Sequence, residues 1–468
     1  MKKVAIFSIP AHGHTNPLLP VAKALVERGN QVRFYSFKDF EKKIQSTGAT
    51  YVSCEKFLPT LTEAEEKALK DISLTEMSIQ DIRITLKMND FLEKEFQTFQ
   101  PDVVYTDSVC FWGKLNAWKF NVPMVVSTTT FAFNQLSSGY IKNSPKELAD
   151  MVLGLPKISK ELKTLEPYGY HVKSTLSLVQ NDNHTDTVVY TSKNFQPYAV
   201  SFSEHYLFAG PSLFSSEKPD KNKERPLVYI SMGTVINERP DFYKKCIEAL
   251  KMLSADVILS VGKALNIETL GTLPDNIKAY PYVNQLEILA KADVFITHCG
   301  MNSVSESLYM ATPMVLYPQT GEQYAVARRT REIGAGIELK AETVSAIKDA
   351  VEEILNNKEY GKSAEKCSQD FRNCCGTSGI AEFIENAPHT VDEKNDALAE
   401  LKKTNIKVQI VYWLIAVCIT VLFGVLVTWR FVWVIGVVAG ILFSFVTKPL
   451  AQKIWWKKIQ KVQGRCLC

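Results

Sequence analysis

The chain has 468 residues, more than one hydrophobic core usually organises, so two or three domains are expected. It is 46% hydrophobic and 22% charged, as folded proteins are, and its net charge of +4 is too small to favour nucleic acid as a partner. The 10 cysteines are scattered without the spacing of a zinc site, which indicates a reducing compartment.

A doubly wound α/β domain is predicted at residues 1–214, because apolar, β-rich runs alternate there with helical patterns. Ligands bind such open sheets beyond the carboxyl ends of the strands, at the point where the strand order reverses. The predicted strands are residues 4–9, 31–36, 50–53, 102–106 and 122–126.

The turn after the first of these strands, PAHGHTNP at residues 10–17, carries two histidines. It leads into a predicted helix with Asn16 as N-cap and Pro17 at the first helical position. The first and fourth strands are neighbours in the common strand order. His14 follows the first strand and Asp107 ends the fourth, so we expect their side chains to meet. An exposed turn that happens to hold two histidines is the alternative.

A second α/β domain is predicted at residues 227–390, joined to the first by a polar linker at 215–226, SSEKPDKNKERP. Ligands commonly bind in the cleft between two such domains, so we expect the binding site there. The predicted strands of this half are residues 227–231, 257–261, 277–280, 294–297 and 314–317.

A phosphate site is predicted where the fourth strand of the second half ends, in THCGMNS at residues 297–303. A helix that starts near Asn302 directs its free backbone N–H groups and the positive end of its dipole to one spot. Glu306, four residues further, lies on the same helical face and could accept the ribose hydroxyls of a nucleotide. Ordinary helix capping and first-turn charge are the alternative interpretation.

The carboxyl end departs from ordinary composition. Residues 408–447 hold a single charge, Arg430, and would form a helix of about 60 Å, twice the thickness of the hydrocarbon core of a bilayer. The sequence therefore predicts a membrane hairpin at 408–447, preceded by a polar linker at 391–407.

Lysines flank this predicted hairpin on both sides, so both flanks, and the body of the protein, are expected in the cytosol. The tail at 448–468 mixes tryptophans with basic residues, as an interfacial segment does, and Cys466 and Cys468 are candidate lipid acceptors. No secretion signal is predicted.

Several motifs in one order resemble the family 1 UDP-dependent glycosyltransferases, most closely their bacterial macrolide-glycosyltransferase branch. They are SIPAHGHTNPLLPVAKALVERG, LVYISMGT, YPYVNQLEIL, FITHCGMNSVSESL and TPMVLYPQTGEQ, and they cover residues 1–390 but not the membrane segment. The resemblance implies the GT-B fold, with two facing Rossmann-like domains. The first domain would bind the acceptor and the second the UDP-sugar.

The resemblance also implies a role for each matching position. His14 would be the catalytic base, with His12 the less favoured candidate, and Asp107 would hold the imidazole. Thr234, His298, Asn302 and Ser303 resemble the diphosphate contacts, Glu306 the ribose carboxylate, and Tyr282 the ring that stacks on uracil. Glu322 and Gln323 resemble the pair that binds the sugar hydroxyls. The expected donor-binding set is Thr234, Tyr282, Val283, Gln285, His298, Gly300, Asn302, Ser303, Glu306, Glu322 and Gln323.

The chemistry of these groups agrees with that reading. An alcohol that attacks an anomeric carbon needs a base near neutral pH, and an imidazole with a pKa of ~6.5 suits this task. One displacement inverts the anomeric centre. The helix N-terminus and His298 would compensate the charge of the departing diphosphate. No Asp-x-Asp pair occurs, so neither a metal nor another cofactor is expected. The aromatic candidates for an acceptor pocket are Phe111, Trp112, Phe131 and Phe133.

The sequence thus predicts a membrane-anchored enzyme that moves a hexose, with glucose favoured, from a UDP-sugar to a hydroxyl of an apolar acceptor. A sterol or another lipid alcohol is the hypothesis for that acceptor. Two alternatives remain open. One is an epimerase-type enzyme of the same fold, and the other is a non-catalytic membrane scaffold that retains nucleotide binding.

Overall fold

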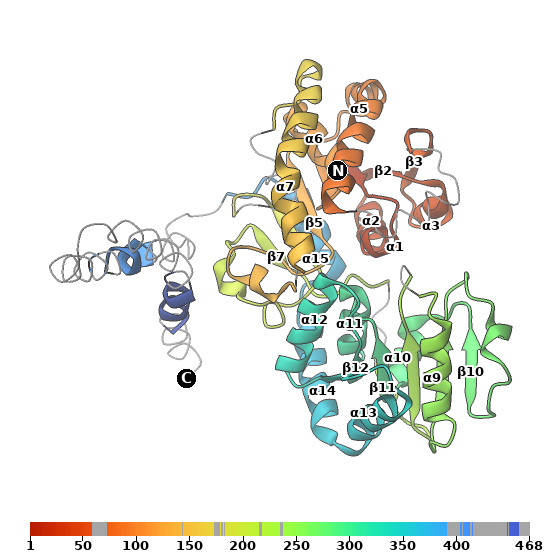
Figure 1. Cartoon of the computed structure of the whole chain (residues 1–468). Coiled ribbons are helices and arrows are strands. Elements are labelled where there is room, and N and C mark those ends of the chain that lie inside the picture. Colours follow the sequence, from red (N-terminus) through yellow and green to blue (C-terminus); the bar gives the residue numbers. More distant parts are fainter. Residues whose placement is uncertain are drawn as a thin grey trace. The chain divides into compact units, whose positions relative to one another are not determined.

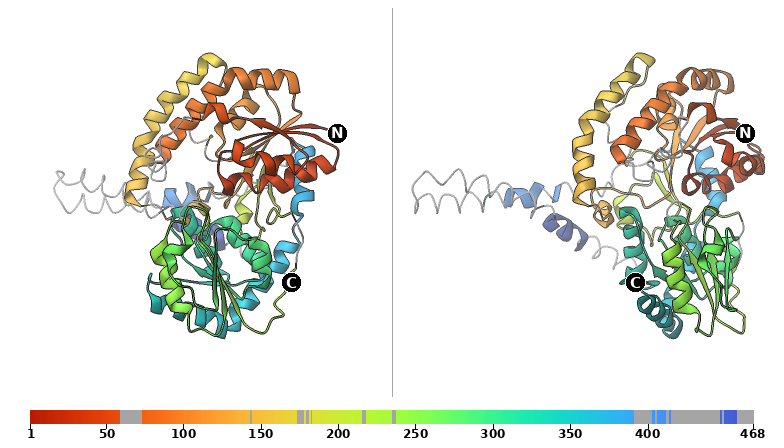
Figure 2. Two further views of the ribbon diagram at one scale, coloured as in Figure 1. Left: turned by 90° about the vertical axis from the view of Figure 1, so that its right-hand side faces the viewer. Right: turned by 45° about the vertical axis from the view of Figure 1, so that its right-hand side comes forward.

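The computed structural model contains two parallel sheets, each surrounded by helices, and Figure 2 shows both lobes from two further sides. The predicted pair of doubly wound domains is therefore confirmed. The structure describes residues 1–58, 73–142, 144–172, 178, 181, 183–214, 218–234, 237–390, 403–404, 406–411, 414, 447 and 449–457.

The first lobe has a seven-stranded sheet of order β3-β2-β1-β4-β5-β6-β7, all of whose paired strands are parallel (Figure 1). Its first five strands match the predicted runs, and β1 and β4 are neighbours, with Phe7 opposite Thr106. The strands are β1 (Lys3–Phe7), β2 (Gln31–Ser36), β3 (Thr50–Ser53), β4 (Val103–Asp107), β5 (Met124–Thr128), β6 (Thr187–Val189) and β7 (Tyr206–Phe208).

Helices of this lobe connect successive strands. The longest, α5, begins at a serine N-cap, because the Ser73 side chain accepts a hydrogen bond from the Glu76 N–H. The α-helices are α1 (His12–Thr15), α2 (Leu18–Glu27), α3 (Glu41–Gln45), α5 (Leu74–Phe99), α6 (Phe111–Lys119) and α7 (Pro145–Leu162). The 3-10 turns are η1 (Lys38–Phe40), η2 (Glu55–Phe57), η3 (Ser137–Tyr140) and η4 (Lys163–Tyr168). A further 3-10 turn, η5 (Ala199–Ser201), groups with the carboxyl-terminal residues in a separate unit.

The histidine turn differs in detail from its prediction. Residues His12–Thr15 form the helical turn α1, and Asn16 keeps helical dihedrals, with its N–H bonded to the His12 carbonyl. Asn16 is therefore not an N-cap, and Pro17 takes that position before α2. The chain turns helical five residues earlier than predicted, because Ala11 and not Asn16 has the extended conformation of an N-cap.

The second lobe has a six-stranded parallel sheet of order β10-β9-β8-β11-β12-β13, in which the first and fourth strands are again neighbours. The strands are β8 (Leu227–Ser231), β9 (Asp256–Ser260), β10 (Ile277–Tyr280), β11 (Val294–Thr297), β12 (Met314–Leu316) and β13 (Gly336–Glu338). The helices are α9 (Pro240–Leu250), η6 (Ile267–Leu270), α10 (Gln285–Lys291), α11 (Met301–Tyr309), α12 (Gly321–Glu332), α13 (Val344–Asn356), α14 (Lys358–Arg372) and α15 (Gly376–Glu385).

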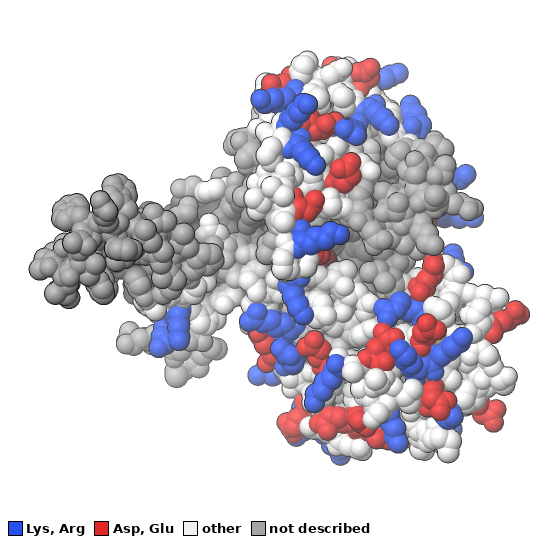
Figure 3. Space-filling view, viewed as in Figure 1, with Lys and Arg blue, Asp and Glu red and all other residues white. Residues whose placement is uncertain are grey.

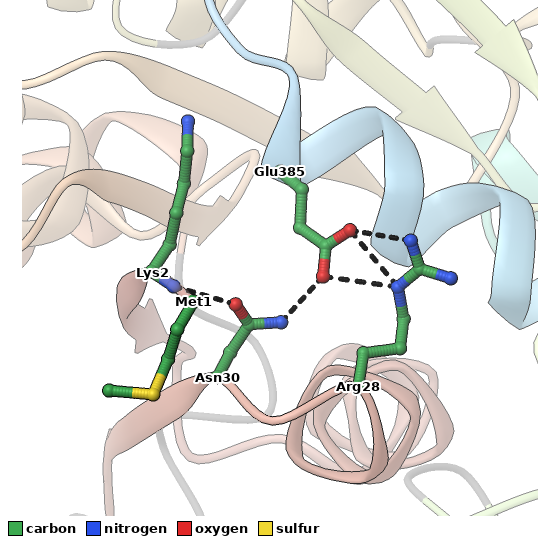
Figure 4. Close-up of a pocket in the computed structure, with 5 residues that line it drawn as sticks. All are labelled: Met1, Lys2, Arg28, Asn30 and Glu385. Atoms are coloured by element: carbon green, nitrogen blue, oxygen red, sulfur yellow. Dashed lines mark hydrogen bonds and ion pairs between the residues drawn. The ribbon is translucent and has the colours of Figure 1, made fainter.

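Helix α15 returns to the first lobe, although it lies within the segment predicted as the second domain. Ile380 and Ile384 share a buried cluster with Val4 and Leu25. At the end of the helix, Glu385 accepts hydrogen bonds from the Arg28 guanidinium at 2.6 and 3.0 Å and from the Asn30 amide at 2.6 Å. These groups line a shallow pocket beside the N-terminus (Figure 4). The first lobe therefore takes part of its core from the end of the second segment.

Charges of both signs are interspersed over the described atoms of the face drawn in Figure 3. Several form short-range pairs on α12, such as Arg328 with Glu332 at 3.0 Å. Exposed pairs of this kind contribute little to stability, about 0–1 kcal/mol each.

The predicted membrane segment falls mostly on residues that the structure leaves out. Of the run at 408–447, only residues 408–411, 414 and 447 are described, and Cys466 and Cys468 are not. Among the described residues, no helix has both the length and the apolar character that crossing a bilayer requires. The hairpin and the lipid acceptors therefore stay predictions.

Candidate active site

Two neighbouring strands bring His14 and Asp107 together, as their order predicts. The His14 Nδ1 lies 2.8 Å from an Asp107 carboxylate oxygen, and the other oxygen of this fully buried carboxylate accepts the Val109 N–H at 3.0 Å. A carboxylate on Nδ1 selects the tautomer that leaves Nε2 free of a proton. About a third of the imidazole is exposed, 30%, so Nε2 is able to receive a proton from a ligand.

The same pair sets the basicity of the imidazole. Burial alone lowers the pKa of His14, but the charge and hydrogen bond of Asp107, helped by the charge of Glu322, raise this pKa above its ordinary value. A raised pKa makes His14 a stronger proton acceptor. The arrangement suits a general base that works near neutral pH.

Two further groups near this pair were not predicted. The Thr129 hydroxyl, just after β5, lies 3.3 Å from the His14 Nδ1. Asp81 lies on α5, and burial, followed by repulsion from Asp107, raises the pKa of its carboxyl to about 8. Thr129 follows the strand next to β4, so strand order could have found it. Asp81 sits within a helix whose sequence gives no local signal.

His12 lies apart from the acid–base pair. Its ring meets Phe40 edge to face, with 4.9 Å between the centroids. It therefore helps to shape the turn, the lesser role that the family resemblance implies for it.

On the second lobe, the start of α11 collects the predicted nucleotide contacts. Gly300 is the N-cap, and Asn302 and Ser303 lie in the first turn, where backbone N–H groups have no partners within the helix. Gln285 organises the group, because its amide nitrogen donates to the Glu306 carboxylate at 2.7 Å and to the Ser303 hydroxyl at 3.2 Å. Burial raises the pKa of Glu306, and the hydrogen bond from Gln285 partly offsets this rise.

His298 lies against two glycines that leave room for its ring. A Cβ on Gly233 would stand 2.5 Å from the imidazole, and a Cβ on Gly300 would stand 2.6 Å from it. Burial lowers the pKa of His298 to about 4, so this side chain is neutral at pH 7. His298 is thus able to offer a phosphate a hydrogen bond but no positive charge. The positive end of the α11 dipole is then the group that would compensate the charge of a diphosphate.

The remaining candidates for binding the donor lie on other loops and helices of the second lobe. Thr234 is exposed beyond the end of β8, and Tyr282 is 75% exposed in the loop between β10 and α10, where its ring is accessible to a base. Val283 packs against the cluster beneath α11. Glu322 is exposed and Gln323 half-buried, and both lie in the first turn of α12.

The two halves of the site touch through a hydrogen bond between the lobes. The Asn302 side-chain amide donates to the Gly13 carbonyl at 2.9 Å. The start of α12 also meets the first lobe, where the Lys142 N–H donates to the Gly321 carbonyl at 3.3 Å. The turn that carries His14 therefore lies directly against the first turn of α11.

The four aromatic candidates for the acceptor pocket differ in how far their side chains are exposed. Phe111, Trp112 and Phe131 are at most 3% exposed and belong to packed clusters. Only Phe133 is partly exposed, with its ring edge to face on Phe131 at 6.4 Å. Their packing explains why aromatic residues after a buried strand do not by themselves indicate a pocket.

No group of three or more His, Cys, Asp or Glu side chains is arranged to hold a metal ion within the described part of the chain. The metal-free reaction stays a prediction.

Known proteins resemble this chain in sequence and in fold. The family model for UDP-glucoronosyl and UDP-glucosyl transferase matches residues 217–372. The uncharacterized UDP-glucosyltransferase YdhE of Bacillus subtilis (strain 168) is 33% identical over 392 residues, which cover 82% of this chain and 98% of that protein. The demethyllactenocin mycarosyltransferase of Streptomyces fradiae is 28% identical over 82% of this chain and 86% of its own length.

The crystal structure of the kitacinnamycin glycotransferase superposes with a TM-score of 0.68 at 23% identity and covers 82% of this chain and 98% of its own. That likeness shows the two-lobed GT-B fold. Together with the YdhE match, which spans nearly the whole of that relative, it confirms the family that the motifs predict. The chain belongs to the family 1 UDP-glycosyltransferases.

Proposed function

We propose that this protein transfers a hexose, glucose in the first place, from a UDP-sugar to a hydroxyl group of an apolar acceptor in one inverting displacement without a metal. The observation that carries the proposal is the contact between Gly13 and Asn302, because it sets the His14–Asp107 pair against the start of α11. A base and an anion-binding helix terminus then face one ligand.

The transfer follows from these groups. The acceptor oxygen attacks the anomeric carbon while its proton passes to the His14 Nε2, and the imidazolium that forms is stabilised by Asp107 at 2.8 Å. The bond between the anomeric carbon and the phosphate oxygen breaks, and UDP leaves with the electron pair. The N–H groups at the start of α11 stabilise the charge that develops on the diphosphate. Attack opposite the leaving group inverts the anomeric centre.

The donor is proposed from the family and from the residues at the second lobe. Glu306, held by Gln285, would accept the ribose hydroxyls, and the exposed ring of Tyr282 would stack on uracil. Glu322 and Gln323 would bind the hexose hydroxyls, and their resemblance to the sugar-binding pair of the family favours glucose, although Glu stands where the family more commonly has Asp. UDP-sugars fit a family model described as UDP-glucoronosyl and UDP-glucosyl transferase.

The acceptor and the location are proposed from the carboxyl end. An apolar run at 408–447 with lysines on both sides would hold the cytosolic lobes at a bilayer surface, where a sterol or another lipid alcohol is present.

The test uses membranes from cells that express the full chain and radiolabelled UDP-glucose. We expect the label to enter the organic phase with the wild type and not with His14→Ala. Label confined to water-soluble phenols would overturn the lipid acceptor. Donor that isomerises without transfer would instead show an epimerase, and equal cellular phenotypes of the wild type and His14→Ala would show a scaffold.

A further inference from the structure

Arg239 occupies the loop after β8 and was not predicted as a site residue. It lies five positions beyond Thr234, immediately before α9. Its guanidinium donates to the Gln319 side-chain oxygen at 2.6 Å, to the Tyr317 hydroxyl at 3.2 Å and to the Glu342 carboxylate at 2.6 Å. The loop that carries one predicted diphosphate contact is thereby linked by hydrogen bonds to the loop between β12 and α12.

Glu342, which is itself held by other side chains, fixes the position of the Arg239 guanidinium. Glu342 also accepts a hydrogen bond from the Lys245 ammonium at 2.8 Å and another from the Tyr317 hydroxyl. Burial raises the pKa of Glu342, but the hydrogen bonds from Lys245 and Tyr317 bring it below its ordinary value, so the carboxylate stays ionised. Arg239 and Glu342 are both partly buried, at 29% and 24% exposure, so water competes only in part for their contact.

Gln319 connects Arg239 to the start of α12 through hydrogen bonds. Its side-chain oxygen is held by Arg239, and its side-chain nitrogen donates to the Tyr317 carbonyl at 3.1 Å. Its backbone N–H donates to the Gln323 side-chain oxygen at 2.7 Å. With that oxygen engaged, the Gln323 amide nitrogen is the side-chain group left to donate to a ligand.

We propose that Arg239 is a positioning residue for the sugar end of the donor site, acting through Gln319 on the orientation of Gln323. The inference rests on the proposed function, in which Gln323 binds the hexose hydroxyls. In this role Arg239 would contact neither the sugar nor the diphosphate itself. The planar guanidinium donates hydrogen bonds to Gln319, Tyr317 and Glu342 at the same time. The ammonium group of a lysine cannot reproduce this geometry.

The test compares two ligands that differ only in the sugar. The dissociation constants of UDP-glucose and of UDP are measured by calorimetry for the full-length wild type and for Arg239→Gln. We expect UDP-glucose to bind about tenfold more weakly and UDP with unchanged affinity, since a lost charge-assisted hydrogen bond disturbs only the sugar contact. Arg239→Lys should fall between the two proteins.

The same titrations separate this role from a structural one. If Arg239→Gln weakens both ligands equally, the residue only holds the Thr234 loop, and the inference is overturned. It is also overturned if neither affinity changes. Because binding is measured without turnover, a wild type that binds both ligands but transfers no sugar would reject the proposed function alone.

Further variants show whether a loss of affinity in Arg239→Gln comes from the proposed contact or from misfolding. Gln319→Ala removes the link itself and should reproduce the selective loss of UDP-glucose affinity. The double variant with Arg239→Gln should be no worse than either single change, because both act through one contact. Additive losses would contradict the inference. Arg331→Gln is the matched control, since its pairing with Glu338 at 2.9 Å is exposed on the same lobe, and both affinities should equal those of the wild type.

Discussion

The side-chain amide of Asn302 donates a hydrogen bond of 2.9 Å to the backbone carbonyl of Gly13 and so joins the first turn of α11 to the turn that carries His14. One residue thus belongs to both halves of the site. Under the proposed function Asn302 would contact the diphosphate and also link the turn of the base to it.

Replacement of Asn302 should therefore affect the donor and the base together. We expect Asn302→Ala to lower kcat/KM for the UDP-sugar about tenfold, because one neutral hydrogen bond and its positioning are lost. Asn302→Asp should be worse than Ala, since a carboxylate is repelled by both the Gly13 carbonyl and the diphosphate. Steady-state kinetics of both variants make the comparison, and an Asp variant more active than the Ala variant would contradict this role.

The acid–base pair makes a prediction about pH. The base has to be unprotonated, so kcat/KM should fall as the pH drops through the His14 pKa, which Asp107 holds above its ordinary value against the effect of burial. Asp107→Asn removes the raising charge. We expect the acid limb of the pH profile to move to lower pH, together with a loss of roughly 10²- to 10⁴-fold in the maximal rate. An unmoved limb would show that another group titrates.

Asp81 makes a prediction about stability. Burial and Asp107 raise the pKa of its carboxyl to about 8, whereas in the unfolded chain the carboxyl ionises near pH 4. Between these values the folded state holds a proton that the unfolded state has released, so this group destabilises the fold as the pH rises. Asp81→Asn should therefore gain melting temperature over the wild type from pH 5 to pH 8.

Thermal melts at several pH values check this expectation. Asp90→Asn, an exposed acid on the same helix, is the control and should show no such trend. A constant difference between Asp81→Asn and the wild type across that range would mean that the Asp81 carboxyl is already ionised at pH 5.

The two glycines beside His298 should not tolerate a side chain. In Gly300→Ala the new Cβ would stand 2.6 Å from the imidazole, and in Gly233→Ala it would stand 2.5 Å away on a residue with φ of +77°. We expect both variants to displace His298 and to weaken UDP binding about tenfold, with Gly233→Ala also losing stability through its strained backbone.

Gly361→Ala is the control for these glycines, because nothing lies within 4 Å of its added Cβ and the residue is inside α14. Calorimetric titration with UDP should give the wild-type affinity for this variant, and its melting temperature should rise, since Ala is favoured over Gly in a helix by about 1 kcal/mol. Tight UDP binding by Gly300→Ala would show that the imidazole is able to move aside.

Much of this site could be predicted because strand order turns distant residues into neighbours. His14 follows β1 and Asp107 ends β4, and these strands pair as a doubly wound sheet requires. The strands β6 and β7 were not predicted, since three residues are too few to show a periodic pattern.

Other features depend on tertiary contacts alone. Arg239 looks like an ordinary charged residue before a helix, and only the approach of Gln319 and Glu342 gives it a role. Asp81 acquires its raised pKa from burial and from the nearby Asp107, which no pattern in its own helix records. The partly exposed edge of Phe133 and the full burial of Trp112 likewise follow from packing rather than from sequence.

Helix α15 determines when the first lobe can complete its fold during synthesis. Ile380, Ala381 and Ile384 enter the hydrophobic cluster behind β1, and Glu385 fastens their helix to Arg28. The amino-terminal lobe is therefore unfinished when its own stretch of chain ends, and a ribosome must synthesise the whole second lobe before the first can close. Expressed by itself, a fragment ending at the 215–226 segment would leave an apolar groove open to water and to other chains.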